Sequence, residues 1–176
     1  MAIEIERKFV LSSNAWRALS HMRERLVDGL LASAEGRKIR VRLYETRATL
    51  TVKSAREGLK RTEFEYDIPI ADATELIAKH SGEKVLAKTR HYVEHMGFTW
   101  QIDEYDGVLE GVVIAEVELM SENVFVPLPP WVGREVTHDP DYRQSNMLAA
   151  RLAALSEAHG GAFLRAAPSS SVGQEQ

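Results

Sequence analysis

The chain has 176 residues, about the length of one domain, and its composition (44% hydrophobic, 27% charged) is that of an ordinary globular protein. With 22 Lys and Arg against 26 Asp and Glu, the formal net charge is -4, which argues against a general binder of long nucleic acids, a class that is usually basic. The absence of cysteine excludes disulfides, a thiolate zinc site and a cysteine nucleophile, and the apolar runs are too short for a membrane helix.

The strongest hydrophobic period along the chain is two residues, which is typical of β-strands. The first segment alternates Ile3, Ile5 and Phe9 with charged residues, and its charged start lacks the apolar core of a signal peptide, so we expect a cytoplasmic protein. In chain order, strands are predicted at 3–10, 25–33, 38–44, 47–53, 61–68, 84–94, 98–105 and 112–120. Gly, Pro, Ser or Asp residues at their ends support these limits.

Helices are predicted at 13–22, 71–80 and 144–158. The last is an Ala/Leu-rich segment that ends at Gly160-Gly161. Segment 161–176 has too little apolar content to offset the entropy of ordering, so we expect a disordered C-terminal tail there. Residues 1–160 contain no repeat or linker and are predicted to form one domain of the mainly β (α+β) class.

The charged faces of the strands are segregated by sign. An ordinary solvated face mixes both signs, because like charges that are directly opposite on neighbouring strands repel. Acidic residues on three of the strands are Glu4, Glu6, Asp103, Glu116 and Glu118. Basic residues on three others are Arg40, Arg42, Lys53, Lys88 and Arg90. This pattern indicates a site with an acidic and a basic pole.

Residues i and i+2 of a strand share one face and lie about 6.5–7 Å apart. Glu4/Glu6 and Glu116/Glu118 therefore offer closely spaced carboxylates, and such all-oxygen ligands suit a hard cation, Mg²⁺ or Mn²⁺. The basic pairs of the same spacing can hold successive phosphate oxygens. Metal on one wall and guanidinium on the other is the arrangement that phosphoryl transfer requires. Periodicity alone is compatible with charged faces that point outward over a separate core or inward into a closed barrel.

The opening EIERKF, with Glu4, Glu6 and Lys8, resembles the ExExK signature of CYTH-domain proteins, the triphosphate tunnel metalloenzymes. The resemblance continues in order through IRVRLY, LTVKS, RTEFEYDI, KTRHYV, WQIDEYDG and AEVELMSE, and ends in PPWVGREVTHDPDYRQSNMLA. Gln144 stands where the ending of the family has Asn. The resemblance implies an eight-stranded antiparallel closed β-barrel with a few flanking helices, whose tunnel holds a triphosphate.

The resemblance also implies roles for the charged residues. Metal ligands are implied at Glu4, Glu6, Asp103, Glu116 and Glu118. Phosphate-binding residues are implied at Lys8, Arg40, Arg42, Lys53, Arg61, Lys88 and Arg90. Two further positions match the lumen and the tunnel mouth, Glu63 and Arg143. We expect Glu4, Glu6 and Lys8 to be catalytic, because a carboxylate can orient the attacking water and Lys8 can stabilise charge on the phosphates.

Members of this family act as inorganic, thiamine or RNA triphosphatases or as class IV adenylate cyclases. We expect hydrolysis of inorganic triphosphate (tripolyphosphate) to pyrophosphate and phosphate, with Mg²⁺ or Mn²⁺ as cofactor and with side activity on nucleoside triphosphates. A class IV adenylate cyclase and a thiamine triphosphatase remain alternatives, and so does a non-catalytic polyphosphate- or nucleotide-binding module, which would not need the acidic positions. The expected partner is a small triphosphate-containing molecule, not a long nucleic acid or a membrane, and an apolar outer barrel face would favour a homodimer.

Overall fold

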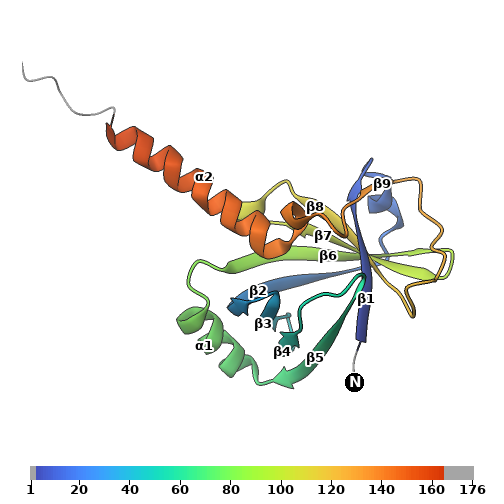
Figure 1. Cartoon of the computed structure of the whole chain (residues 1–176), viewed down its shortest axis with the longest axis horizontal. Coiled ribbons are helices and arrows are strands. Elements are labelled where there is room, and N and C mark those ends of the chain that lie inside the picture. The colour runs from blue at the N-terminus through green and yellow to red at the C-terminus, as the bar shows by residue number, and fades with distance from the viewer. Residues whose placement is uncertain (1–2, 165–176) are drawn as a thin grey trace, which may run out of the picture.

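The computed structural model describes the backbone of residues 3–164 and the side chains of residues 3–157. Its strands are β1 (Ile3–Leu11), β2 (Met22–Ala34), β3 (Arg37–Leu43), β4 (Ala48–Lys53), β5 (Lys60–Ile68), β6 (Val85–His95), β7 (Phe98–Tyr105), β8 (Val113–Glu118) and β9 (Val132–Glu135). Its helices are α1 (Ile70–His80), α2 (Gln144–Leu164) and the short 3-10 helices η1 (Ala15–Leu19), η2 (Gly107–Leu109) and η3 (Pro140–Tyr142). The predicted class, mainly β with a few helices, is confirmed (Figure 1).

Eight of the strands form a closed antiparallel ring. Neighbouring strands follow the order β5-β4-β3-β2-β6-β7-β8-β1, and β1 also pairs with β5, which closes the ring. The start of β1 provides the closing contacts, with Glu4 opposite Arg61, while its later residues pair with β8. The strand β9 pairs with the end of β1 in addition to the ring. The expected eight-stranded closed barrel is therefore confirmed, with one further strand.

The hydrophobic core lies outside the barrel wall. Because side chains alternate across a strand, the inward face is free to carry charged groups once the apolar face is covered from outside. The largest apolar cluster includes Trp16, Trp100 and Trp131, which are at most 1% exposed, packed with Phe9. These tryptophans are packing residues.

The helix α1 covers the outer face of β2, β3 and β4, where its apolar side packs against Val41 and Ala48. The close approach depends on Gly29 in β2, because a Cβ atom there would lie 2.5 Å from Ser81 Oγ and 2.8 Å from Ile77 Cγ1. The helix α2 begins against η2 and η3 and then projects away from the barrel (Figure 1). Among the helices that the structure describes, none has the length and apolarity needed to span a membrane.

The predicted helix at 13–22 is wrong in length and in kind. Only η1 forms there, and β2 begins at Met22, three residues before the predicted strand. Within η1 only Trp16 is buried, whereas Leu19 is 55% exposed, so the segment lacks the apolar face that would stabilise a longer helix. Met22 instead pairs with Tyr92 on β6, and this sheet pairing extends β2.

The predicted helix end at Gly160-Gly161 is also wrong, because α2 continues to Leu164. Glycine lowers helix propensity by about 1 kcal/mol but keeps its backbone N–H, so a glycine pair does not by itself end a helix. The rest of the predicted tail, 165–176, lies outside the described residues. The four-residue strand β9 was not predicted, since its pairing with β1 across more than 120 residues leaves no local pattern.

Candidate active site in the barrel lumen

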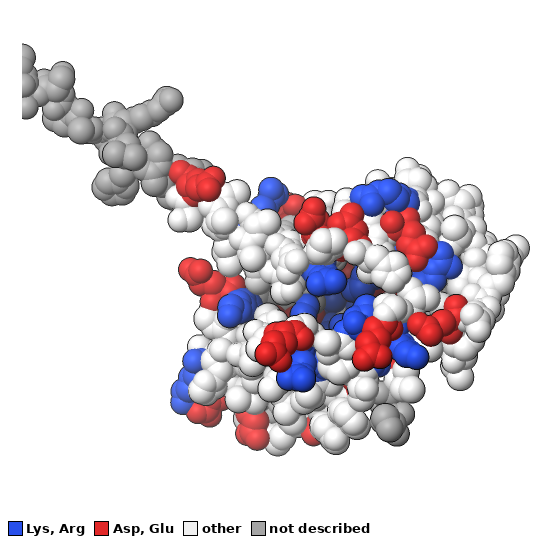
Figure 2. Space-filling view, in the orientation of Figure 1, with Lys and Arg blue, Asp and Glu red and all other residues white. Residues whose placement is uncertain are grey.

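The barrel encloses a cavity of about 600 Å³ that is lined by side chains from all eight strands of the ring. Eleven Lys and Arg and eight Asp and Glu belong to its wall, whereas acidic residues outnumber basic ones in the whole chain. Figure 2 shows basic side chains gathered inside the hollow on this face of the molecule. The cavity is therefore cationic relative to the rest of the protein, which favours an anionic ligand.

With one exception, the residues predicted from the sequence meet in this cavity. Its wall includes Glu4, Glu6, Lys8, Arg40, Arg42, Lys53, Arg61, Glu63, Lys88, Arg90, Glu116, Glu118 and Arg143. The exception is Asp103, which is fully buried behind the wall and accepts hydrogen bonds from Arg90 at 2.7 and 2.8 Å and one from Lys88. Asp103 is thus a counter-ion that orients two cations toward the cavity, and its role as a metal ligand stays a prediction.

Two carboxylates face each other across the ladder between β1 and β8. Glu6 lies directly opposite Glu118, an arrangement of like charges that destabilises a sheet. Burial and the nearby carboxylates of Glu4 and Glu6 raise the pKa of Glu118. Among residues 3–157, no cation forms an ion pair with Glu118, to which Gln101 Nε2 donates a hydrogen bond at 3.4 Å. A bound cation would relieve this repulsion.

Basic side chains contact the carboxylate oxygens of the neighbouring residues Glu4 and Glu6. Lys53 Nζ donates to Glu4 Oε1 at 3.0 Å, and Arg61 contacts both Glu4 and Glu6, the latter at 3.2 Å. Arg56, from the turn between β4 and β5, also contacts Glu6. With these cations in place, no three acidic or histidine side chains of the described residues converge on one point. The donors are nevertheless all oxygens on one wall, which is the donor set of a hard cation.

Glu4 and Glu63 share a hydrogen bond and therefore titrate as a pair. Burial and this hydrogen bond raise the pKa of Glu63 to about 7. Burial alone would also raise the pKa of Glu4, but Lys53 and Arg61 hold it well below its usual range. The cavity thus contains one carboxyl group that changes its protonation state near neutral pH.

The opposite wall is organised by Asp28 on β2. Arg42 donates to both oxygens of Asp28, at 2.6 and 2.9 Å, and Lys88 Nζ lies 3.5 Å from the same carboxylate. Burial lowers the pKa of Lys88 to about 8 despite Asp103 and Asp28. The buried Nε atom of Arg40 has no hydrogen-bond partner among the described residues, so it is a donor without an acceptor.

Lys8 and Glu116 join the two walls. Lys8 Nζ lies 2.6 Å from Glu116 and 3.5 Å from Glu6, and Arg90 Nη2 lies 3.3 Å from the other oxygen of Glu116. These two cations hold the pKa of Glu116 well below its usual value, although burial opposes them. Glu116 is therefore neutralised within the protein, unlike Glu118 two residues later.

Several charged residues of the cavity wall are not among those predicted from the sequence: Asp28, Lys38, Arg56 and Glu65. Lys38 and Glu65 continue the inward alternation of β3 and β5, so the spacing could have identified both. Asp28 lies in the weakly alternating strand RLVDGLL, and Arg56 lies in a turn, so neither carries a periodic signal.

The barrel is closed and antiparallel, with its apolar core outside and ion-paired acidic and basic side chains lining the cavity inside. This architecture defines a class of barrel proteins whose lumen is suited to binding an anion together with a cation. The chain belongs to the CYTH family, because the model of the CYTH domain matches residues 2–151.

The chain is similar to two named relatives in sequence and to a solved structure in fold. The chain is 39% identical to a protein called inorganic triphosphatase from Acetivibrio thermocellus, over 84% of this chain and 94% of the relative. It is 33% identical to an inorganic triphosphatase from Nitrosomonas europaea, over 80% of this chain and 93% of the relative. A crystal structure of an inorganic triphosphatase superposes with a TM-score of 0.59 at 28% identity, covering 84% of this chain and 95% of that one.

Proposed function

We propose that this protein hydrolyses inorganic triphosphate to pyrophosphate and phosphate inside the barrel, with a divalent cation, Mg²⁺ or Mn²⁺, as cofactor. The observation that carries the proposal is the cavity itself, in which an excess of cations surrounds carboxylates that include Glu118, which faces Glu6 and forms no ion pair within residues 3–157. The names of the two relatives, which each cover at least 80% of the chain, support the substrate.

The cation would be held among the carboxylates of Glu4, Glu6 and Glu118, which line the cavity together; Glu118 faces Glu6 and forms no ion pair within residues 3–157. When bound, the cation supplies charge neutralisation for the substrate and lowers the pKa of a bound water. Lys53, Arg56 and Arg61 contact Glu4 and Glu6 in the structure, so metal and substrate binding together would free these cations for phosphate oxygens.

The side chains of the basic wall bind and orient the triphosphate. Arg40 lines the cavity, and Arg42 and Arg90 are held in fixed orientation by Asp28 and Asp103. Preorganised donors of this kind stabilise the charge that develops on the transferred phosphoryl group and on the leaving pyrophosphate.

A carboxylate must orient the attacking water and take its proton. Of the carboxylates of Glu4, Glu6 and Glu118, one that does not hold the cation would take this role, since all three line the cavity. The proton of the water then passes to this carboxylate as the new P–O bond forms and the bond to pyrophosphate breaks.

The test is a panel of tripolyphosphate, ATP and thiamine triphosphate, each with Mg²⁺, with Mn²⁺ and with EDTA. We expect phosphate release from tripolyphosphate that EDTA abolishes and that Glu6→Gln and Glu118→Gln reduce by ~10²-fold or more. Glu75→Gln on the surface of α1 is the matched control and should keep full activity.

Full activity in both lumen variants would overturn the proposal. Cyclic AMP with pyrophosphate as products from ATP would identify a cyclase instead, and preference for thiamine triphosphate would identify a thiamine triphosphatase. Tight binding of tripolyphosphate without turnover in either metal would identify a binding module. A cytoplasmic location and a homodimer stay predictions.

A further inference from the structure

Lys38 lies in the lumen without a neutralising partner. Within residues 3–157 its ammonium group contacts one polar atom, Ser145 Oγ at 3.1 Å, and no carboxylate lies within ion-pair distance. On the neighbouring strand it is directly opposite another lysine, Lys53. Two like charges opposite each other destabilise a sheet, so fold stability does not explain a lysine at this position.

Further cations surround Lys38. Burial and the positive charges of Arg61, Lys8, Arg143 and Lys53 lower its pKa to about 8. Arg143 lines the same cavity, and none of its side-chain atoms forms a hydrogen bond or ion pair in the described part of the chain. Lys8, Lys53 and Arg61 are paired with carboxylates elsewhere in the cavity, whereas Lys38 and Arg143 have no carboxylate partner within residues 3–157.

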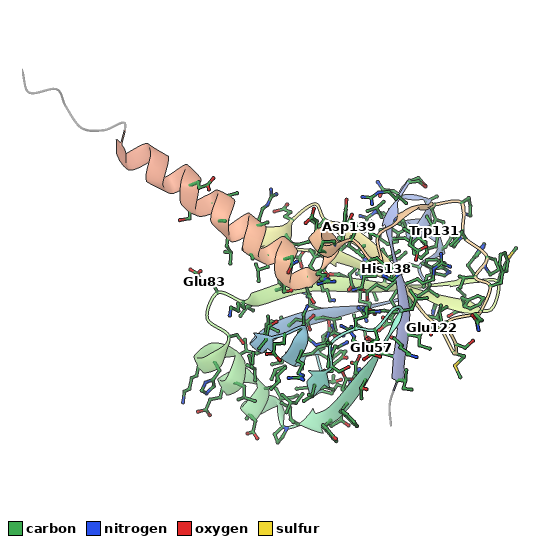
Figure 3. All side chains as sticks on the ribbon, in the orientation of Figure 1. Glu57, Glu83, Glu122, Trp131, His138 and Asp139 are labelled. Carbon is green, nitrogen blue, oxygen red and sulfur yellow. The ribbon has the colours of Figure 1, made fainter. Side chains whose placement is uncertain are left out.

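The chain between β9 and α2, residues 136–146, covers this part of the cavity. At one end, Val136 N donates to Lys8 O at 2.8 Å. At the other end, Gln144 Nε2 donates to Asp28 Oδ2 at 3.2 Å beside the contact between Ser145 and Lys38. Figure 3 shows His138 and Asp139 on the connecting segment.

This cover restricts what can lie on Lys38. Residues 143–146 line the cavity next to the Lys38 ammonium group, which donates to Ser145 Oγ, and they include the first turn of α2, whose dipole favours negative charge. A polyphosphate chain or an ester group cannot continue past that point without displacing the segment. The group that fits is an unsubstituted phosphate end.

We propose that Lys38, with Arg143 and the first turn of α2, binds a free terminal phosphate of the substrate. This inference rests on the proposed function for the identity of the ligand. It adds that the site selects the free terminal phosphate of a linear polyphosphate. It assigns a role to Lys38, which the sequence-based set of phosphate-binding residues does not include.

The experiment measures binding by isothermal titration calorimetry in EDTA, so that no turnover occurs. The probes are linear tripolyphosphate, which has two ends, and the cyclic ion trimetaphosphate, which has none. The proteins are wild type, Lys38→Met, Lys38→Arg and the charge-matched control Lys84→Met, which removes an exposed lysine at the rim of the same cavity. Circular dichroism and thermal melting confirm that each variant is folded.

We expect Lys38→Met to weaken tripolyphosphate binding at least ~10-fold, the usual effect of losing a charged hydrogen bond, and to change trimetaphosphate binding less than ~3-fold. Lys38→Arg should stay within ~3-fold of wild type, and so should Lys84→Met. If trimetaphosphate did not bind to wild type at all, this would support the requirement for a free terminal phosphate. The role of Lys38 would then be tested with linear tripolyphosphate alone.

The inference would be overturned by tripolyphosphate binding by Lys38→Met within ~3-fold of wild type, by equal losses for the ring and the chain, or by no binding of tripolyphosphate by wild type in EDTA. An equal loss in Lys84→Met would do the same, because it would indicate general electrostatics. Binding that depends on Lys38 in a protein without turnover would sink the proposed function but not this inference. If the wild type hydrolysed tripolyphosphate and Lys38→Met bound it as tightly as wild type, this inference alone would be refuted.

Discussion

Glu116 and Glu118 face the same cavity from positions two residues apart on β8, yet their electrostatic surroundings are opposite. Glu116 is paired with Lys8 at 2.6 Å and with Arg90 at 3.3 Å. Glu118 lies opposite the carboxylate of Glu6. The same substitution, Glu to Gln, should therefore change the stability of the metal-free protein in opposite directions at the two positions.

Glu118→Gln removes a like charge from a cross-strand pair, which is worth about 0.2–1 kcal/mol for one pair. We expect the metal-free variant to be more stable than wild type by about 0.5–1 kcal/mol, which raises the melting temperature by about 1–4 °C in a chain of this size. Glu116→Gln leaves Lys8 and Arg90 without their partner. It should cost about 2–3 kcal/mol, less than the ~3–5 kcal/mol of a fully buried pair, because the side chain of Lys8 is 21% exposed.

The assay is urea unfolding and thermal melting in EDTA, followed by circular dichroism. The pKa of Glu118 is raised, so its protonated form stabilises the fold at low pH and this stability is lost as the pH rises through the folded-state pKa. The gain from Glu118→Gln should therefore grow as the pH rises through the folded-state pKa of Glu118 and disappear in acid, where Glu118 is protonated in both states. Addition of Mn²⁺ should raise the melting temperature of wild type more than that of Glu118→Gln. A less stable Glu118→Gln protein in EDTA would refute the reasoning.

Three further predictions follow from single contacts. The pKa of Glu63 is raised to about 7, so it stabilises the fold fully below about pH 4.5 and less as the pH rises through 7; Glu63→Gln should flatten urea-unfolding stability between pH 5 and 8, and an unchanged slope would contradict this. Gly29→Ala should cost about 1–3 kcal/mol, since its Cβ would collide with Ile77, and a wild-type melting temperature would show that α1 can shift at no cost. Asp28→Asn should lower the unfolding free energy in urea by about 3 kcal/mol or more, because it breaks the buried pair with Arg42; a loss below about 1 kcal/mol would mean that the guanidinium finds another partner.

Much of the fold could be predicted from the sequence, because alternation with a period of two is a local property of each strand. The strand at 3–10 and those that carry Arg40 and Lys88 follow directly from it. The failures have local causes too. Segment 13–22 has one buried apolar residue in its 3-10 helix, Trp16, so no longer helix forms. Sheet pairing with β6 instead extends β2 back to Met22.

The candidate site was predicted less completely. Most inward residues of the strongly alternating strands were identified, although Lys38 and Glu65 were not. Asp28 sits on a weakly alternating strand and Arg56 on a turn, so the pattern could not identify them. Asp103 alternates like an inward residue, yet the cations Lys88 and Arg90 lie between it and the cavity. Sequence spacing gives the face of a strand, but it does not give the depth at which a side chain ends.

The sequence by itself determined which side chains share a face, and therefore that acidic and basic groups would be concentrated together. The tertiary structure decided which of them neutralise one another. Glu116 and Glu118 are equivalent in spacing, but antiparallel pairing with β1 sets Lys8 opposite the first and Glu6 opposite the second. Strand register and ring closure depend on pairing between strands that are far apart in the chain. The local sequence pattern therefore does not predict them.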